Sequence, residues 1–180
     1  MKRAAYGLLG AALLSFGIGV ADARAAVTSG AAGGDPRDVQ LLEKLRIGHW
    51  IEVRGSLTGE GVFAARRIEL TGPRQVSALW GPAERGGLPG SLVVLGRPID
   101  VESDTDWRGG SAGSCIGQRV RVLGVPGRRG RISARRVEVR DPGFARVGGR
   151  IESLERLPDG GVGLEVLGIA VQVPADVKQR

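Results

Sequence analysis

The sequence predicts an all-β protein made of two small five-stranded barrels that arise from an internal repeat, with one short N-terminal helix after a signal peptide. Glycine is frequent, with 31 residues in 180, whereas Phe, Trp and Tyr are few, a balance typical of short strands joined by tight turns. Apolar and polar residues alternate along many short segments, and one block of sequence occurs twice. A chain of this length can hold two small domains.

The internal repeat is the strongest of these observations. Residues 47–55 return 69 positions later as residues 116–124, and the register holds without a gap to the matching segments 65–70 and 134–139. Apolar residues occupy every second position in the strand-like parts of these blocks, so that each predicted strand has one apolar face. Chance does not readily give so long a match.

A second element repeats with a spacing of 72 residues, in which residues 92–96 return as residues 164–168. Each copy contains a Leu-Gly pair that indicates a turn or bulge between two strands. We therefore expect ten strands, near residues 49–55, 62–70, 75–81, 91–96, 98–102, 118–124, 131–139, 145–153, 163–168 and 169–174.

One helix is predicted ahead of the first strand. Asp35 can cap it, and Pro36 suits its first position. An apolar stripe follows and ends at Gly48. Its members are Val39, Leu42 and Leu45. Residues 26–34, which precede the helix, are rich in small residues and are expected to form a linker.

Residues 1–25 have the three parts of a cleavable signal peptide. Lys2 and Arg3 provide a basic start, residues 4–20 are apolar, and small residues follow for cleavage after Ala23 or Ala25. A retained membrane anchor is the rival interpretation, but the run is short for a bilayer and is interrupted by glycines. We expect an exported protein in the periplasm or at the cell exterior, with no membrane span after signal cleavage.

Three short motifs resemble those of an uncharacterised family of exported bacterial proteins, domain of unknown function 5666 (DUF5666), whose tandem units are similar to small OB-type barrels. These motifs are the glycine-bounded strands at 48–55 and 117–124, the closing strands that begin at Ala65 and Ala134, and the hairpins at Leu95-Gly96 and Leu167-Gly168. The resemblance covers most of residues 45–177. It implies two OB-like barrels and brings no catalytic residues with it.

The family's unit begins near residue 75 and ends near 139, which gives one complete five-stranded copy in this chain. The segments 35–70 and 145–177 are then two partial copies, offering two and three strands. Because an unpaired sheet edge is a liability, we expect the two parts to complete one split barrel, within one chain or exchanged between two chains. The complete copy at 75–139 would be inserted into it. Strands 49–55 and 145–153 should then lie in one sheet.

The sequence offers little for catalysis, cofactor binding or metal binding, and we expect no enzyme. His49 is the only histidine, and its counterpart in the repeat is Gln118. The lone Cys115 is interpreted as a partly buried apolar residue rather than a reactive thiol or an intermolecular bridge. Four carboxylates at every second position suggest either a calcium loop or a solvated strand face turned toward arginines. They are Asp100, Glu102, Asp104 and Asp106.

A dense set of arginines is the sharpest candidate site in a chain whose formal net charge is +7. Its candidate anion-binding members are Arg119, Arg121, Arg128, Arg129, Arg131, Arg135 and Arg136, with Arg140 following. Arginine pairs well with phosphate and sulfate groups, although an outward strand face in an arginine-rich protein would look the same. Trp50 is a candidate surface aromatic residue that either stacks on a ligand or covers the end of a barrel.

These features predict an exported, non-enzymatic binding or cell-envelope interaction module. The alternative is a more specific binder of an anionic polymer, such as lipopolysaccharide, acidic polysaccharide or extracellular nucleic acid. The partner is then an envelope protein or such a polymer, and chromosomal nucleic acid is not expected.

Overall fold

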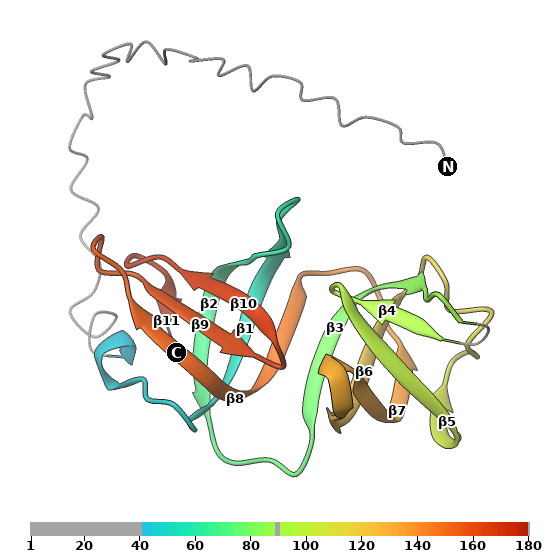
Figure 1. Ribbon diagram of the computed structural model, residues 1–180. Coiled ribbons are helices and arrows are strands. Elements are labelled where there is room, and N and C mark those ends of the chain that lie inside the picture. The colour runs from blue at the N-terminus through green and yellow to red at the C-terminus, as the bar shows by residue number, and fades with distance from the viewer. Residues whose placement is uncertain (1–40, 89–90, 180) are drawn as a thin grey trace, which may run out of the picture. The chain divides into compact units, whose positions relative to one another are not determined.

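The computed structural model of this protein describes residues 41–88 and 91–179 and is mostly β (Figure 1). Its eleven strands are accompanied by a short helix at residues 41–44 and a single 3-10 turn, η1 (Arg128–Gly130). The expectation of a mostly β fold with one short helix is confirmed. The predicted signal peptide, linker and helix start, residues 1–25, 26–34 and 35–40, lie outside the described residues.

Five consecutive strands form a mixed β-barrel, called the central barrel below. They are β3 (Ser77–Arg85), β4 (Leu92–Val94), β5 (Arg97–Arg108), β6 (Arg119–Pro126) and β7 (Ile132–Val139). They pair in the order β3-β4-β5-β7-β6, and β3 also pairs with β6, which closes the barrel. All these pairings are antiparallel except the parallel pair β5–β7.

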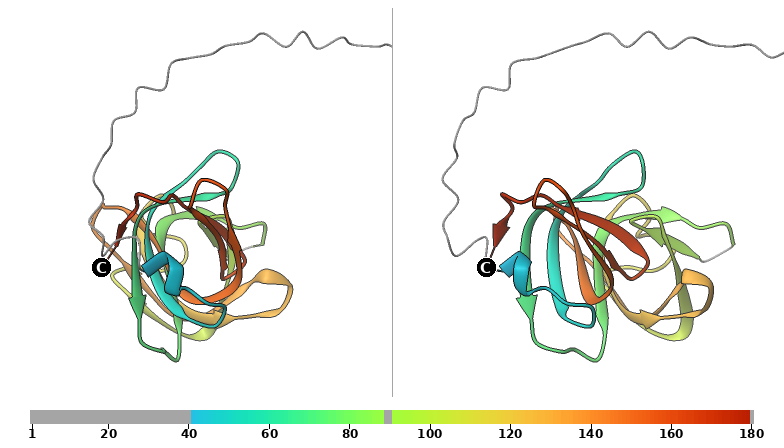
Figure 2. Two further views of the ribbon diagram at one scale, coloured as in Figure 1. Left: turned by 90° about the vertical axis from the view of Figure 1, so that its left-hand side faces the viewer. Right: turned by 60° about the vertical axis from the view of Figure 1, so that its left-hand side comes forward.

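The outer strands come from the two ends of the described chain. They are β1 (Trp50–Leu57), β2 (Phe63–Thr71), β8 (Ala145–Arg156), β9 (Val162–Val166), β10 (Ile169–Val173) and β11 (Lys178–Gln179). The first five pair in the order β8-β9-β10-β2-β1, and β1 pairs in turn with β8. Only β2–β10 is parallel among these pairs, and β11 adds to β2. Figure 2 shows them around a common axis, with the short helix at one end.

The central barrel and the outer strands are joined by main-chain pairing. Ala78–Trp80 of β3 pairs with Arg146–Gly148 of β8, so β2, β1, β8, β3, β6 and β7 form one continuous sheet, called the shared sheet below. Leu79 and Val147 lie opposite each other on its buried side. Arg97 of β5 makes a second link, because its guanidinium donates to the carbonyl oxygens of Gly130 and Gly168.

The core is lined by the alternating apolar residues of the strands, among them the fully buried Phe63, Ile51 and Val120. Leu42 and Leu45 of the helical segment are also buried in it. Arg156 of β8 donates to the carbonyl oxygens of Leu42, Glu43 and Leu45 at the end of that segment, where few backbone donors reach them.

Two glycines create matching bulges. The register shifts between Arg54 and Gly55 in the β1–β2 pair and between Leu123 and Gly124 in the β6–β7 pair. A Cβ at Gly55 would collide with the carbonyl oxygen of Ala64, and one at Gly124 with that of Ser133. Glycine is therefore required at both positions because the partner backbone approaches too closely for any side chain.

Two strand boundaries differ from the sequence-based expectation. The predicted strand 91–96 ends at Val94 because Leu95 and Gly96 have φ of 51° and 72°, which makes them the two central residues of a tight hairpin turn. The predicted strand 98–102 continues to Arg108. The side-chain hydroxyl of Thr105 bridges an irregular stretch in it by donating to Ala134 O and accepting from Glu102 N.

We predict that Gly124→Ala lowers the free energy of unfolding by about 1–3 kcal/mol, the usual cost of overpacking, because a backbone carbonyl cannot move aside. Urea unfolding at neutral pH measures this. The control is Gly59→Ala in the β1–β2 turn, where a Cβ meets nothing within 4 Å and the change should stay within about 0.5 kcal/mol. Equal effects of the two substitutions would contradict the assigned role of the bulge.

Candidate anion-binding face

The outer side of the shared sheet carries a row of cross-strand neighbours, called the central row below. Starting from β2 and ending on β7, its members are Arg67, Arg54, Arg146, Trp80, Arg121 and Glu138, each opposite the next in register. Lys178 of β11 lies opposite Arg67 and extends the row by one strand. The sheet pairing thus brings together residues that are far apart in the sequence.

Trp80 lies at the junction of the central barrel and the outer strands. Its side chain is only 9% exposed. The guanidinium carbons of Arg121 and Arg146, from the strands on either side, lie 5.1 and 5.6 Å from a ring centroid. Cation–π contacts at these distances are favourable and hold the two arginine heads against the indole. Trp80 is therefore a support for arginines rather than an open stacking surface.

Two carboxylates neutralise part of the central row. Glu138 is almost fully buried and forms ion pairs with Arg121, Arg136 and Arg140. Burial by itself raises the pKa of Glu138, but the hydrogen bond from Arg140 and the charges of Arg140, Arg121 and Arg136 outweigh it, so the pKa lies below its ordinary value.

On the other side of the junction, Glu52 contacts Arg54 at 3.4 Å and Arg146 at 3.3 Å. Arg67 and Lys178 have no ion-pair partner within the described part of the chain. The cationic surplus of the central row therefore lies toward β2 and β11.

More basic residues flank the central row where β7 connects to β8. Arg119 of β6 donates to Gly143 O at 2.5 Å, and burial together with the nearby charge of Arg146 lowers the pKa of Arg119. Phe144 is 60% exposed, and the guanidinium of Arg66 lies 5.6 Å from its ring centroid. This flank adds two arginines and one exposed aromatic ring to the surface.

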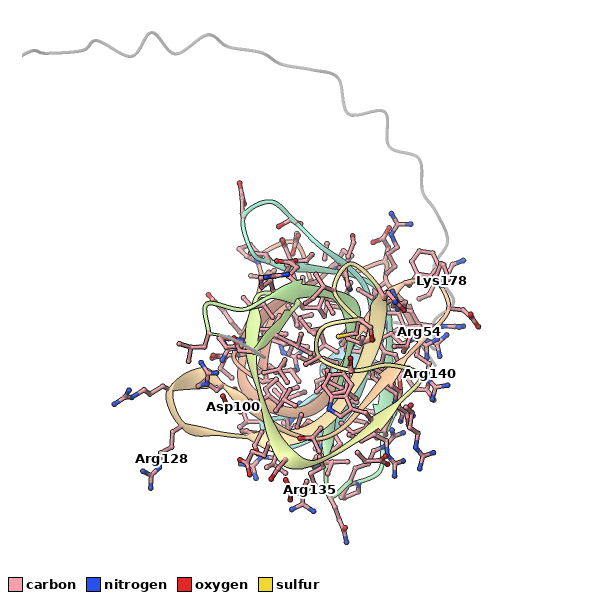
Figure 3. The ribbon with its side chains drawn as sticks, turned by 90° about the vertical axis from the view of Figure 1, so that its right-hand side faces the viewer. Arg54, Asp100, Arg128, Arg135, Arg140 and Lys178 are labelled. Atoms are coloured by element: carbon pink, nitrogen blue, oxygen red, sulfur yellow. The ribbon has the colours of Figure 1, made fainter. Side chains whose placement is uncertain are left out.

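We call the combined surface the Arg face. It consists of Arg54, Arg66, Arg67, Arg119, Arg121, Arg140, Arg146 and Lys178, with Trp80 and Phe144 among them. Figure 3 shows Arg54, Arg140 and Lys178 along one side of the protein, whereas Arg128 and Arg135 project in other directions.

The structure separates the arginines that the sequence grouped together. Arg119 and Arg121 belong to the Arg face, but Arg131 pairs with Asp100 of β5, and Arg136 pairs with Asp106 at 2.7 Å as well as with Glu138. The other three are exposed and away from the central row. They are Arg128 and Arg129 in η1 and Arg135 in the β7 bulge.

Sequence reasoning missed Arg54, Arg66, Arg67, Arg146 and Lys178 as partners of Arg119 and Arg121. One signal for two of them was present, because Ala65-Arg66-Arg67 is the repeat counterpart of Ala134-Arg135-Arg136. In each copy the bulge inserts one arginine, so that two consecutive arginines both stay out of the core. β1 and β8 lie in one sheet, as the sequence analysis expected, but no local pattern indicated that β3 would pair with the other edge of β8.

Two further candidate residues, Trp50 and Cys115, are partly or fully buried in the fold. Trp50 is half-buried and lines a shallow depression with Thr71 and Arg74, so it is not a freely exposed aromatic residue. Cys115 is fully buried, and burial raises the pKa of its thiol.

The four carboxylates predicted to mark a calcium loop or a solvated strand face lie on β5. Asp100 faces Arg131, and Asp106 faces Arg136 and Arg108. Residues 41–88 and 91–179 contain no group of three or more His, Cys, Asp or Glu side chains placed to hold a metal ion. Over the same residues, no helix has the length and apolar character needed to cross a membrane.

Fold and surface together define a β-barrel protein whose most prominent feature is a basic outer sheet face. The chain belongs to the DUF5666 family, a domain of unknown function, whose model matches residues 26–69 and 82–138, more than half of the sequence. The resemblance seen in the sequence is thereby confirmed, although the matched ranges do not include β8, β9 and β10. No curated protein and no solved structure matches the chain.

We predict that Glu138→Gln lowers the free energy of unfolding at pH 7 by about 1–3 kcal/mol, because it removes the buried negative charge, and one of the two acceptor oxygens, that pair with three arginines. Since the folded-state pKa of Glu138 is lowered, its contribution is present above the ordinary glutamate pKa and is lost as pH falls through the lowered value. As the pH is lowered below about 4, the free energy of unfolding should therefore fall less for the variant than for the wild type.

Urea unfolding at neutral and acid pH measures both effects. The matched control is Glu84→Gln, which changes an exposed carboxylate of β3 that forms no ion pair within the described residues and should behave as wild type. Parallel pH curves for wild type and Glu138→Gln would show that the carboxylate does not carry the predicted linkage.

Proposed function

We propose that this protein is an exported, non-enzymatic β-barrel module that binds anionic polymers on its Arg face. One observation carries the proposal, namely the row of arginines that crosses the strands of the shared sheet from β2 to β6. The cations are spread along a surface instead of lining a pocket. Such an arrangement suits a long ligand with many charges better than a small molecule.

We further propose that the chain contains two OB-type barrels derived from a tandem repeat. The outer strands 35–70 and 145–177 would form the split copy, and 75–139 the inserted one. Leaving β11 aside, each set of five strands has one parallel pair, β2–β10 or β5–β7, which supports this origin. Matching backbone geometry supports it as well, because Leu95 and Leu167 share a positive φ, as do Gly96 and Gly168.

The chemistry of arginine supports an anionic ligand. A guanidinium presents a planar fork of N–H donors that matches the two oxygens of a carboxylate, sulfate or phosphate. Arg121 and Arg146 keep part of that fork in solvent, with 28% and 35% of their side chains exposed, although Trp80 holds them. Arginines held in place before binding lose less conformational entropy when a ligand arrives.

We expect the protein to bind anionic polymers such as lipopolysaccharide, acidic polysaccharide or nucleic acid with an affinity that falls as salt rises. The triple variant Arg54→Ser, Arg67→Ser, Arg119→Ser should bind weakly, and its slope of log affinity against log salt should be smaller by about two to three. Calorimetric titration of residues 26–180 across a salt series measures this.

The matched control removes three arginines of the original candidate set that lie off the Arg face, Arg128→Ser, Arg129→Ser, Arg135→Ser. It has the same net charge as the first variant and should keep most of the affinity. Equal losses in the two variants would indicate attraction by overall charge alone. A folded wild-type protein that binds no polymer on the panel would contradict the proposal and favour an envelope protein as the partner.

Export is the second part of the proposal and rests on residues 1–25. We expect that expression of the full chain in a bacterial cell yields a periplasmic or extracellular product that begins at Arg24 or Ala26. N-terminal sequencing and intact mass of the fractionated protein measure the cleavage site. Replacing Leu13 and Leu14 with Arg should trap the precursor inside the cell, and an uncleaved wild-type product in the cytoplasm would contradict export.

A further inference from the structure

We propose that the ligand of the Arg face is an extended acidic polysaccharide that lies across the strands, with about one charged sugar for each strand crossed. It contacts the outer strands and the central barrel at the same time. This inference rests on the proposed function, because it names the class and the binding mode of the polymer for the same face.

Strand geometry sets the direction and the spacing of the charges. Arg67, Arg54 and Arg146 lie on adjacent strands, and Arg121 lies two strands further on, beyond Trp80. Neighbouring strands are about 4.8 Å apart, so the row from β2 to β6 is about 19 Å long. An extended chain of pyranose rings advances by about one strand spacing for each ring. A polysaccharide with one carboxylate or sulfate per ring therefore meets a cation on four of the five strands from β2 to β6, and it meets Trp80 on β3.

The flanks of the central row confine a ligand to this path. On one side lie Glu52, which pairs with Arg54 and Arg146, and Glu69 opposite it on β2, and both carboxylates repel an anion. On the other side lie Arg66, Arg119 and the exposed ring of Phe144. A polyanion thus meets carboxylates along one edge and cations along the other, and the face of a sugar ring can pack on Phe144.

The aromatic residues favour a polysaccharide over a single-stranded nucleic acid. Binding of single strands relies on successive aromatic rings on which bases stack. Trp80 is 9% exposed and faces arginines from both neighbouring strands, and Phe144 is the one large aromatic side chain of the described residues that is exposed. The face therefore supplies many charges but few stacking surfaces.

The position of β8 makes the outer strands and the central barrel one binding unit. Arg54, Arg66 and Arg67 come from the outer strands, whereas Arg119 and Arg121 come from the central barrel. The β3–β8 pairing fixes the spacing between these two groups. A short oligosaccharide reaches only one group, and a longer one reaches both.

The experiment is a calorimetric titration of residues 26–180 with oligogalacturonates of defined length, from the dimer to the dodecamer, at low salt. We expect the dissociation constant to fall with each added sugar up to about the hexamer and then to level off. Arg67→Ser on the outer strands and Arg119→Ser on the central barrel should each weaken hexamer binding about three- to tenfold. Arg128→Ser is the matched control and should change it less than twofold.

Two comparison ligands make the result decisive, and thermal unfolding verifies that each variant is folded. Methyl-esterified hexagalacturonate keeps the sugar rings but loses the charges, and it should not bind. Single-stranded DNA with the same number of charges should bind more weakly than the hexagalacturonate. An affinity independent of length, loss in only one of the two arginine variants, or tighter binding of DNA overturns this inference.

The two proposals fail in different ways. If other anionic polymers bind the Arg face but oligogalacturonates and sulfated dextran oligosaccharides of the same lengths do not, the proposed function stands and the polysaccharide inference is wrong. If none of these polyanions binds the folded protein, both are wrong.

Discussion

The pairing of β3 with β8 is the interaction on which the remaining structure depends. It covers only Ala78–Trp80 and Arg146–Gly148, yet it joins the central barrel to the outer strands and makes one sheet of six strands. Trp80 lies at its centre, with Arg121 and Arg146 on the neighbouring strands. Because both arginines contact this ring, the same few residues contribute to the fold and to the basic surface.

The glycine bulges connect backbone geometry to surface chemistry. A regular strand would turn one of two consecutive arginines toward the core, where an unpaired charge is costly. The register shifts opposite Gly55 and Gly124 insert one residue, so that Arg66 and Arg67, like Arg135 and Arg136, all avoid the interior. The first pair belongs to the Arg face, and Arg136 of the second neutralises Asp106 and Glu138.

Sequence reasoning located nearly all the strands because each has its own alternating pattern and glycine-marked end. It was less accurate where a contact between residues far apart in the sequence determines the end of a strand or the surface on which a side chain lies. β5 continues past residue 102 because the Thr105 hydroxyl donates to Ala134 across the parallel partner strand. It also grouped arginines by their closeness along β6, η1 and β7, but alternation, the bulge and the ion pairs with Asp100 and Asp106 send them to different surfaces.

The sequence by itself determined the β class, the positions of the strands and turns, and the family, because these follow from local periodicity, glycine placement and short motifs. Only the tertiary structure decided which arginines act together. Arg54, Arg67, Arg146 and Arg121 are neighbours because β1, β2, β8, β3 and β6 are adjacent in one sheet. Strand adjacency depends on which apolar faces pack into a common core, and no single segment contains that information.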